Sequence, residues 1–280
     1  VFSVFLLFLS FYYNEDGSGG GAKGDFEVTY GFILALQDNL LADPTKWTLV
    51  HTPLHFMILS VVTKIISNPY LLRFLFCIFS ILLPLFFFKT ILFSNKKKNY
   101  LSSNIFLLSA AIIFIPSFRY TSIWANDLIT SLIFFTVSIY FFKKWEQNKK
   151  KDIDKNSLLQ ILFLVLATYT RQYFAVFFIY FLFQYFKIFS YQNFLKLFML
   201  CVLSSLPVFY YVYLFPELLT GQHISLKSVN LFVLGNSSIL SLTLIPIILV
   251  NSFYRTVSIN DFIIPALISF FVVSLLTINF

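Results

Sequence analysis

Long apolar runs, separated by short polar stretches, occupy most of the 280-residue chain. A helix that crosses a membrane needs roughly 20 residues of this kind. Because lipid offers no partner to an unpaired backbone group, such dense runs predict helices rather than strands. The pattern predicts about ten segments, at 1–13, 50–67, 70–93, 101–117, 127–143, 157–170, 172–189, 194–215, 236–254 and 261–280. The expected fold is therefore an all-α, polytopic transmembrane helical bundle, as a single domain over residues 1–280.

Residues 14–49 form the longest polar interruption, and they carry a second pattern. Apolar residues recur at helical spacing between 25 and 41, for example Phe26, Tyr30, Ile33 and Leu36. Pro44 then ends the pattern. This spacing predicts a short amphipathic helix that lies at the membrane surface, within the first external loop of the protein.

The composition agrees with an integral membrane protein. Hydrophobic residues make up 59% of the chain and charged residues 11%, with a mean hydropathy of +0.83. A soluble domain carries about 25% charged residues. The chain begins and ends inside apolar runs, so we expect it to be a fragment with a truncated first helix. Cys77 and Cys201 also lie in apolar runs, and we assign them neither a disulfide nor a metal.

The net charge of +8 comes largely from lysine runs at 95–99 and 143–155. The positive-inside rule explains such runs as cytoplasmic loops, and nothing in the chain resembles a nucleic-acid module. Loops at 117–126, 170–172 and 216–235 then fall outside. Two predicted segments, 50–67 and 70–93, separate residues 14–49 from the lysine run at 95–99. If both cross the membrane, residues 14–49 are cytoplasmic, and if only one crosses, they are external. An abundance of Asn, Lys and Phe favours a bacterial inner membrane, with the endoplasmic reticulum as the alternative.

Ionisable residues at membrane depth are costly, which makes them functional candidates. They are Asp25, Glu27, Lys46, His51, His55, Arg73, Arg119, Asp127 and Arg171. Structural explanations stay open beside the functional ones. Asp25 fits the first turn of a helix as a partner of the helix dipole, and Arg119 with Asp127 fits an orienting ion pair. Arg171 fits a snorkelling side chain. His51 and His55 share a helix face as metal ligands would, but no third ligand is evident.

Several short motifs occur in a recognisable order. They are GDFEVTYGFILAL from Gly24, WTLVHTPLHFMIL from Trp47, NPYLLR ending at Arg73, FRYTSIWANDLI from Phe118 and ATYTRQYFAVF from Ala167. Over residues 1–190 this order resembles the GT-C superfamily of polytopic membrane glycosyltransferases, of the protein mannosyltransferase or aminoarabinose transferase type. The resemblance to dolichol-linked glucosyltransferases is fainter. The chain departs from the family pattern by reading D-F-E instead of D-E, and H-T-P-L instead of P-P.

The resemblance implies transfer of a sugar from a polyprenyl-phosphate donor to a lipid, glycan or protein acceptor. A loop carboxylate would act as general base, with Asp25 as first choice and Glu27 as second, because residues i and i+2 point to different sides of a helix. Substrate-binding residues would be Lys46, His51, His55, Arg119, Asp127 and Arg171, with cations stabilising the released phosphate. We expect no cofactor, although a divalent metal at the two histidines stays open. The competing interpretations are a transporter or lipid-linked glycan flippase, and an enzyme of the O-antigen ligase or polymerase type.

Overall fold

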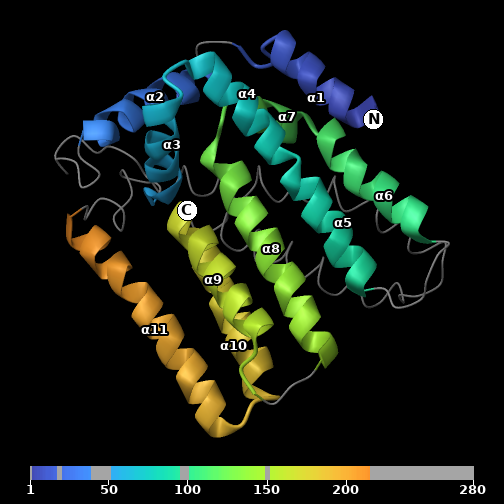
Figure 1. Cartoon of the computed structure of the whole chain (residues 1–280), viewed down its shortest axis with the longest axis vertical. Helices are drawn as coiled ribbons and strands as arrows, with labels where there is room; N and C mark the ends of the chain where they lie inside the picture. The colour runs from blue at the N-terminus through green and yellow to red at the C-terminus, as the bar shows by residue number, and fades with distance from the viewer. Residues whose placement is uncertain (1, 18–20, 39–51, 95–100, 149–151, 215–280) are drawn as a thin grey trace, which may run out of the picture. The chain divides into compact units, whose positions relative to one another are not determined.

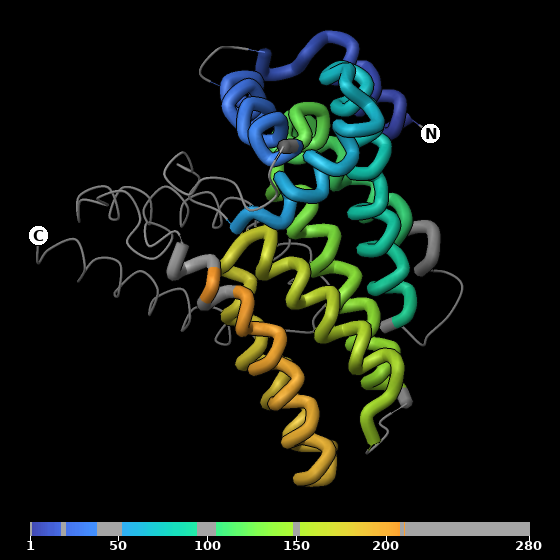
Figure 2. Tube along the Cα trace, turned by 60° about the vertical axis from the view of Figure 1, so that its left-hand side comes forward, coloured from blue at the N-terminus to red at the C-terminus, as the bar shows by residue number. Residues whose placement is uncertain are grey.

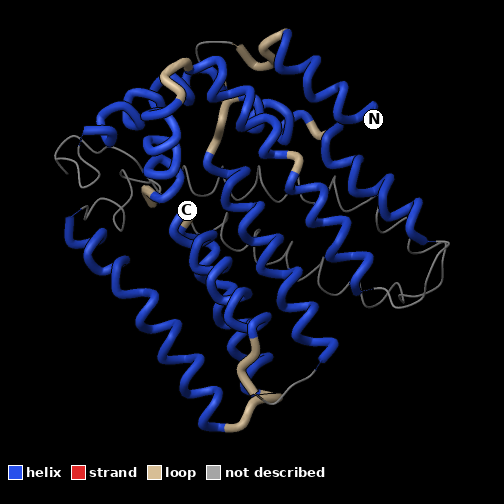
Figure 3. The backbone as a smooth tube through the Cα atoms, in the orientation of Figure 1, coloured by secondary structure: helices blue, strands red, loops and turns tan. Residues whose placement is uncertain are grey.

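The structure, a computed structural model, describes residues 2–17, 21–38, 52–94, 101–148 and 152–214 of the chain. These residues belong to one compact unit, Val1–Leu219. Figure 3 draws the described residues as helices and short loops, and these ranges contain no strand. The all-α prediction is confirmed for this part of the chain. The predicted segments at 236–254 and 261–280 lie outside the described residues, as do Lys46 and His51.

The helices follow the predicted apolar segments closely (Figure 1). They are α1 (Phe2–Tyr12), α2 (Ala22–Asp38), α3 (Leu54–Ile65), α4 (Pro69–Ser80), α5 (Leu82–Ser94), α6 (Leu101–Ala111), α7 (Pro116–Ile123), α8 (Asp127–Asn148), α9 (Lys155–Thr170), α10 (Val176–Phe186) and α11 (Tyr191–Leu214). Two 3-10 turns, η2 (Ile112–Phe114) and η3 (Gln172–Ala175), precede α7 and α10. Helix α8 packs along α9 and α5, and α2 packs against α3.

Two stretches are long and apolar enough to cross a membrane. They are Pro69–Phe93, which joins α4 and α5 into 25 residues, and Asp127–Gln147, with 21 residues. A third candidate is the pair Ile105–Phe114 and Pro116–Ile123, which is bent by 66°. The structure thus supports two or three membrane spans among the described residues. It does not confirm the predicted count of about ten.

The bend between η2 and α7 has a direct cause in the sequence. Pro116 has no backbone N–H and restricts the residue before it to extended conformations. Ile115 accordingly adopts φ −70° and ψ 119°, and α7 restarts with Pro116 in its first turn. The apolar run at 101–117 was predicted as one membrane segment, and the structure divides it at residue 115 into a bent pair that is either a broken span or a re-entrant loop.

The buried side chains form two clusters. The first joins α1, α2, α3, α4, α7 and the first half of α8, and it includes Leu7, Phe26 and Ile129. The second joins the end of α8 to α9, α10 and α11, whose backbones are drawn in green to orange in Figure 2. At its centre the rings of Trp145 and Tyr185 meet edge to face, with centroids 4.4 Å apart. The candidate site described below lies against the first cluster.

Helix α9 begins with a reciprocal cap directly after the second lysine run. The Asp154 carboxylate accepts a hydrogen bond from the Ser157 backbone N–H at 2.9 Å, and the Ser157 hydroxyl oxygen accepts from the Asp154 N–H at 3.1 Å. This capping box satisfies two donors that the start of a helix otherwise leaves unpaired. It fixes the residue at which the polar loop ends and α9 begins.

Replacing Asp154 tests the importance of this cap. We expect Asp154→Ala to lower the free energy of unfolding by about 1 kcal/mol, because the side-chain acceptor is lost. Asp154→Asn retains an acceptor oxygen and should stay close to wild type. Thermal unfolding in detergent micelles, followed by circular dichroism, measures both. Equal losses in the two variants would contradict the capping role.

Candidate functional site

A cavity of about 650 Å³ opens where the end of α1, the start of α2, the start of α4 and the end of α7 meet. We call it the Arg73 cavity. Its lining combines one carboxylate, two cations and four aromatic rings. The lining residues are Asn14, Gly17, Lys23, Phe26, Glu27, Tyr30, Pro69, Tyr70, Arg73 and Trp124. Such a mixture of aromatic walls and a few convergent polar groups is typical of ligand sites.

Arg73 is the best-anchored polar residue of this cavity. Its side chain is 7% exposed. Its Nε donates to the Ile123 carbonyl at 2.9 Å, and its Nη2 donates to Asn14 Oδ1 at 3.0 Å. The guanidinium carbon lies 3.4 Å from the centroid of the Trp124 ring, a stacked cation–π contact. These contacts hold the guanidinium in one position in the cavity wall.

No acidic residue in the described ranges neutralises Arg73. The ion pairs found there join Lys23 to Glu27, Arg119 to Glu15, Lys143 to Glu146 and Arg171 to Asp127. The two hydrogen-bond acceptors of Arg73 are neutral, a carbonyl and an amide. A buried charge without a counter-ion is costly. The cavity therefore presents an uncompensated positive charge to any anion that enters it.

Helix α2 brings Glu27 to the cavity, but it does not bring Asp25. Phe26, between them, is buried, whereas both carboxylates are exposed. Glu27 lines the cavity and forms an ion pair with Lys23 at 3.7 Å, one helical turn earlier. Asp25 lies in the first turn of α2, where a carboxylate suits the helix dipole. The geometry thus favours Glu27, the second choice of the sequence analysis, over Asp25.

Two acids that directly follow α1, Glu15 and Asp16, connect this part of the chain to α7 and α2. Asp16 Oδ2 accepts a hydrogen bond from the Ala22 N–H at 2.8 Å, which caps α2. Glu15 forms a bidentate pair with Arg119, with Nε–Oε2 at 2.8 Å and Nη2–Oε1 at 2.7 Å. The Arg119 hydrogen bond holds the pKa of Glu15 below its usual value of 4.5. The suggested pairing of Arg119 with Asp127 is therefore wrong.

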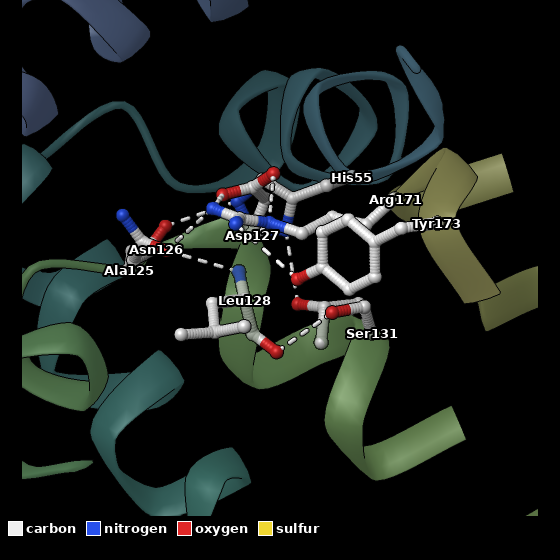
Figure 4. Close-up of polar contacts among 9 residues, drawn as sticks. His55, Ala125, Asn126, Asp127, Leu128, Ser131, Arg171 and Tyr173 are labelled. Carbon is white, nitrogen blue, oxygen red and sulfur yellow. Dashed lines mark hydrogen bonds and ion pairs between the residues drawn. The ribbon is translucent and has the colours of Figure 1, made fainter. Parts of the chain in front are cut away.

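Asp127 is paired with Arg171 instead (Figure 4). Arg171 Nε donates to Asp127 Oδ2 at 2.9 Å, and Arg171 Nη2 donates to Oδ1 at 2.6 Å. The Asp127 side chain is 6% exposed and that of Arg171 is 16% exposed. Asn126 and Tyr173 supply further oxygens to the guanidinium, at 3.4 and 3.3 Å. This pair fastens the start of α8 to the end of α9.

His55 lies beside this pair, and both of its ring nitrogens are occupied (Figure 4). Its Nε2 lies 2.9 Å from the Ala125 carbonyl, and its Nδ1 lies 2.9 Å from the Thr130 hydroxyl. Because a carbonyl only accepts, Nε2 carries the proton and Nδ1 accepts from Thr130. Neither nitrogen is left for a metal ion, and no group of three metal-binding side chains occurs within the described ranges. His55 thus joins α3 to α8.

The predicted site residues therefore separate into groups. His55, Asp127 and Arg171 form one cluster, Arg119 is paired with Glu15, and Glu27 lines the cavity. Arg73 was a candidate without an assigned binding role, Glu15 was considered only with Asp16 as a second acidic site, and Asn14 and Trp124 were not predicted. Arg73 carried the clearest signal in the sequence, as one of only two charges, with Lys89, in the 25-residue apolar stretch Pro69–Phe93.

No protein-family model matches the chain, and neither a curated protein nor a solved structure matches it. The resemblance to the GT-C superfamily therefore rests on the motifs quoted above.

The Glu15–Arg119 pair makes a pH-dependent prediction. Because the folded pKa of Glu15 is lowered, its stabilisation is fully present above pH 4.5 and is lost as the pH falls through the folded pKa. We expect Glu15→Gln to cost about 1 kcal/mol at neutral pH, a value reduced by partial solvent exposure. Unfolding measured across this pH range should show the difference from wild type shrinking on acidification. A constant difference would contradict the pairing.

The Asp127–Arg171 pair predicts a larger effect. Asp127→Asn leaves the partly buried Arg171 charge without its counter-ion, and we expect a loss of about 3 kcal/mol in the free energy of unfolding. The matched control is Glu146→Gln, which removes the exposed pair with Lys143 and should change stability by less than about 1 kcal/mol. Thermal unfolding of both variants in detergent provides the comparison. Similar losses would show that the Asp127 pair is no more than a surface contact.

Proposed function

We propose that the protein transfers a sugar from a polyprenyl-phosphate donor to an acceptor hydroxyl at the external membrane surface. One observation carries the proposal: a carboxylate, Glu27, and an uncompensated guanidinium, Arg73, line the same cavity at the end of a candidate membrane span. Such a transfer needs a base for the acceptor and a cation for the departing phosphate. The cavity holds both kinds of group.

The position of the cavity along the helices supports this function. Pro69, which lines the cavity, is the first residue of one candidate span, and Trp124 lies three residues before the start of the other at Asp127. Both spans thus run away from the cavity, and the lysine runs at 95–99 and 143–155 lie at their far ends. Since lysine-rich loops mark the cytoplasmic side, the cavity is external in this arrangement.

The short length of helix α3 supports a single membrane crossing, instead of two, between residues 14–49 and the lysine run at 95–99. It has 12 residues, which gives a length of about 18 Å, against about 30 Å for the hydrocarbon core of a bilayer. If α3 does not span, Pro69–Phe93 is the single crossing between these segments. The polar segment 14–17 and α2 are then external, which agrees with the preferred placement of the first loop.

The chemistry follows from the residues of the cavity. The acceptor oxygen forms a bond to the anomeric carbon of the sugar, while the bond from that carbon to the phosphate oxygen breaks. The acceptor proton passes to Glu27, and the electron pair of the broken bond stays on the phosphate, next to Arg73 and Lys23. Arg119 and Arg171, the cations first considered, are already neutralised by bidentate carboxylates. They serve here to hold the helices in place.

The two neighbouring carboxylates of α2 provide a matched test. We expect Glu27→Gln to lower the transfer rate by roughly 100-fold or more, the usual contribution of a general base. Asp25→Asn, two residues away and outside the cavity lining, should remain within about threefold of wild type. Transfer is measured in membranes supplied with radiolabelled polyprenyl-phosphate sugars, at matched expression.

A wild-type protein that consumes no donor would overturn the proposal. Movement of the labelled lipid across the membrane without transfer would then favour the transporter or flippase. Loss of transfer in Asp25→Asn, with normal rates in Glu27→Gln, would return the role of base to Asp25.

A further inference from the structure

The Arg73 cavity carries a positive charge that the described part of the protein leaves open. Of the ionisable groups in its lining, Lys23 and Arg73 are positive and Glu27 is negative, and Glu27 is paired with Lys23. Arg73 uses Nε and one Nη for protein acceptors, and Nη1 has no acceptor among the described residues. A guanidinium has five N–H donors, so several remain available at the cavity wall.

We propose that the Arg73 cavity is a binding site for a phosphate ester, held by Arg73 and Lys23, and that Lys23 leaves Glu27 when the phosphate binds. The inference rests on the proposed function only in assigning this phosphate to the sugar donor. A phosphate ester suits the site because its oxygens accept several charge-assisted hydrogen bonds at once. Its negative charge also compensates the buried guanidinium.

Arg73 is held ready for such a ligand. Its guanidinium is stacked on Trp124 at 3.4 Å and lies 5.3 Å from the centroid of the Phe11 ring. The bond to the Ile123 carbonyl fixes its rotation. Because the guanidinium is ordered before the ligand arrives, less side-chain entropy is lost on binding. Arg171, which is only partly buried, differs from Arg73 because Asp127 occupies its donors.

Lys23 completes the site as an exchangeable cation. Its ion pair with Glu27 spans 3.7 Å, and the two side chains are 43% and 63% exposed. Exposed pairs of this kind are weak, so an anion beside Arg73 can compete with Glu27 for the ammonium group. Release of Lys23 leaves the Glu27 carboxylate free to accept a proton from an acceptor hydroxyl. Binding of the phosphate and exposure of the base are thereby coupled.

The test measures binding of decyl phosphate to the full chain in neutral detergent micelles by titration calorimetry. We expect Lys23→Gln to weaken binding about fivefold, as for the loss of one charge-assisted contact. Glu27→Gln should tighten it about two- to fivefold, because the competitor for Lys23 is removed. The matched control is Lys143→Gln, which breaks a comparable exposed pair with Glu146 outside the cavity and should leave binding unchanged.

Arg73→Lys should weaken binding roughly tenfold or more, since the fork of donors is lost. Arg73→Lys also loses packing on Trp124. If Arg73→Lys fails to fold, Lys23→Gln and Glu27→Gln still decide the test. Wild-type protein that does not bind decyl phosphate would overturn the inference. The inference would also be overturned if Lys23→Gln and Glu27→Gln both bound decyl phosphate with the wild-type affinity.

Competition identifies the source of the phosphate. Inorganic phosphate at millimolar concentration that displaces decyl phosphate would show that the free anion suffices, whereas no displacement would assign the site to a phosphate carried by a lipid. Neither sugar nor acceptor is present in these titrations. Phosphate binding without sugar transfer would therefore support the anion site and reject the transferase. Sugar transfer without decyl phosphate binding would support the transferase and reject the anion site.

Discussion

The desolvated guanidinium of Arg73 is the interaction on which the arrangement of the first core depends. A buried charge must be stabilised by several groups at once, and here they come from different elements. Asn14 follows α1, Phe26 belongs to α2, and Ile123 and Trp124 end α7. The indole N–H of Trp124 in turn donates to the Glu15 carbonyl at 2.8 Å. One side chain on α4 thus connects this helix to three other chain segments, and the cavity lies where they meet.

The sequence predicted the helices well because membrane-like composition leaves few alternatives. Apolar runs without polar alternation yield helices, and Pro44 and Asp25 delimited α2 to within a few residues of Ala22–Asp38. The lengths of the runs were less informative. The segments at 50–67 and 101–117 were both predicted as membrane segments, yet α3 has 12 residues and the second run breaks before Pro116. Hydropathy alone does not predict where a helix ends within an apolar run.

The ion pairs were beyond the reach of sequence reasoning. Arg119 pairs with Glu15, 104 residues away, and Arg171 pairs with Asp127, 44 residues away. Spacing along one helix predicts neighbours only at three or four residues. Any of several acids was therefore an equal candidate for either arginine. Helical geometry did predict that Asp25 and Glu27 would face different ways, but the choice between them required the position of Phe26 against the core.

The glycine-rich stretch before α2 owes at least one of its residues to the geometry of the site. A Cβ atom at Gly21 would collide with the carboxylate of Asp16, and that carboxylate caps α2 through the Ala22 N–H. The cap determines where α2 begins, and so it sets the positions of Lys23, the next residue, and of Glu27, about one turn further along. A side chain at residue 21 would displace the cap and shift both charges relative to Arg73. The glycine is thus tied to the cavity through the start of the helix, although it contributes no functional group to it.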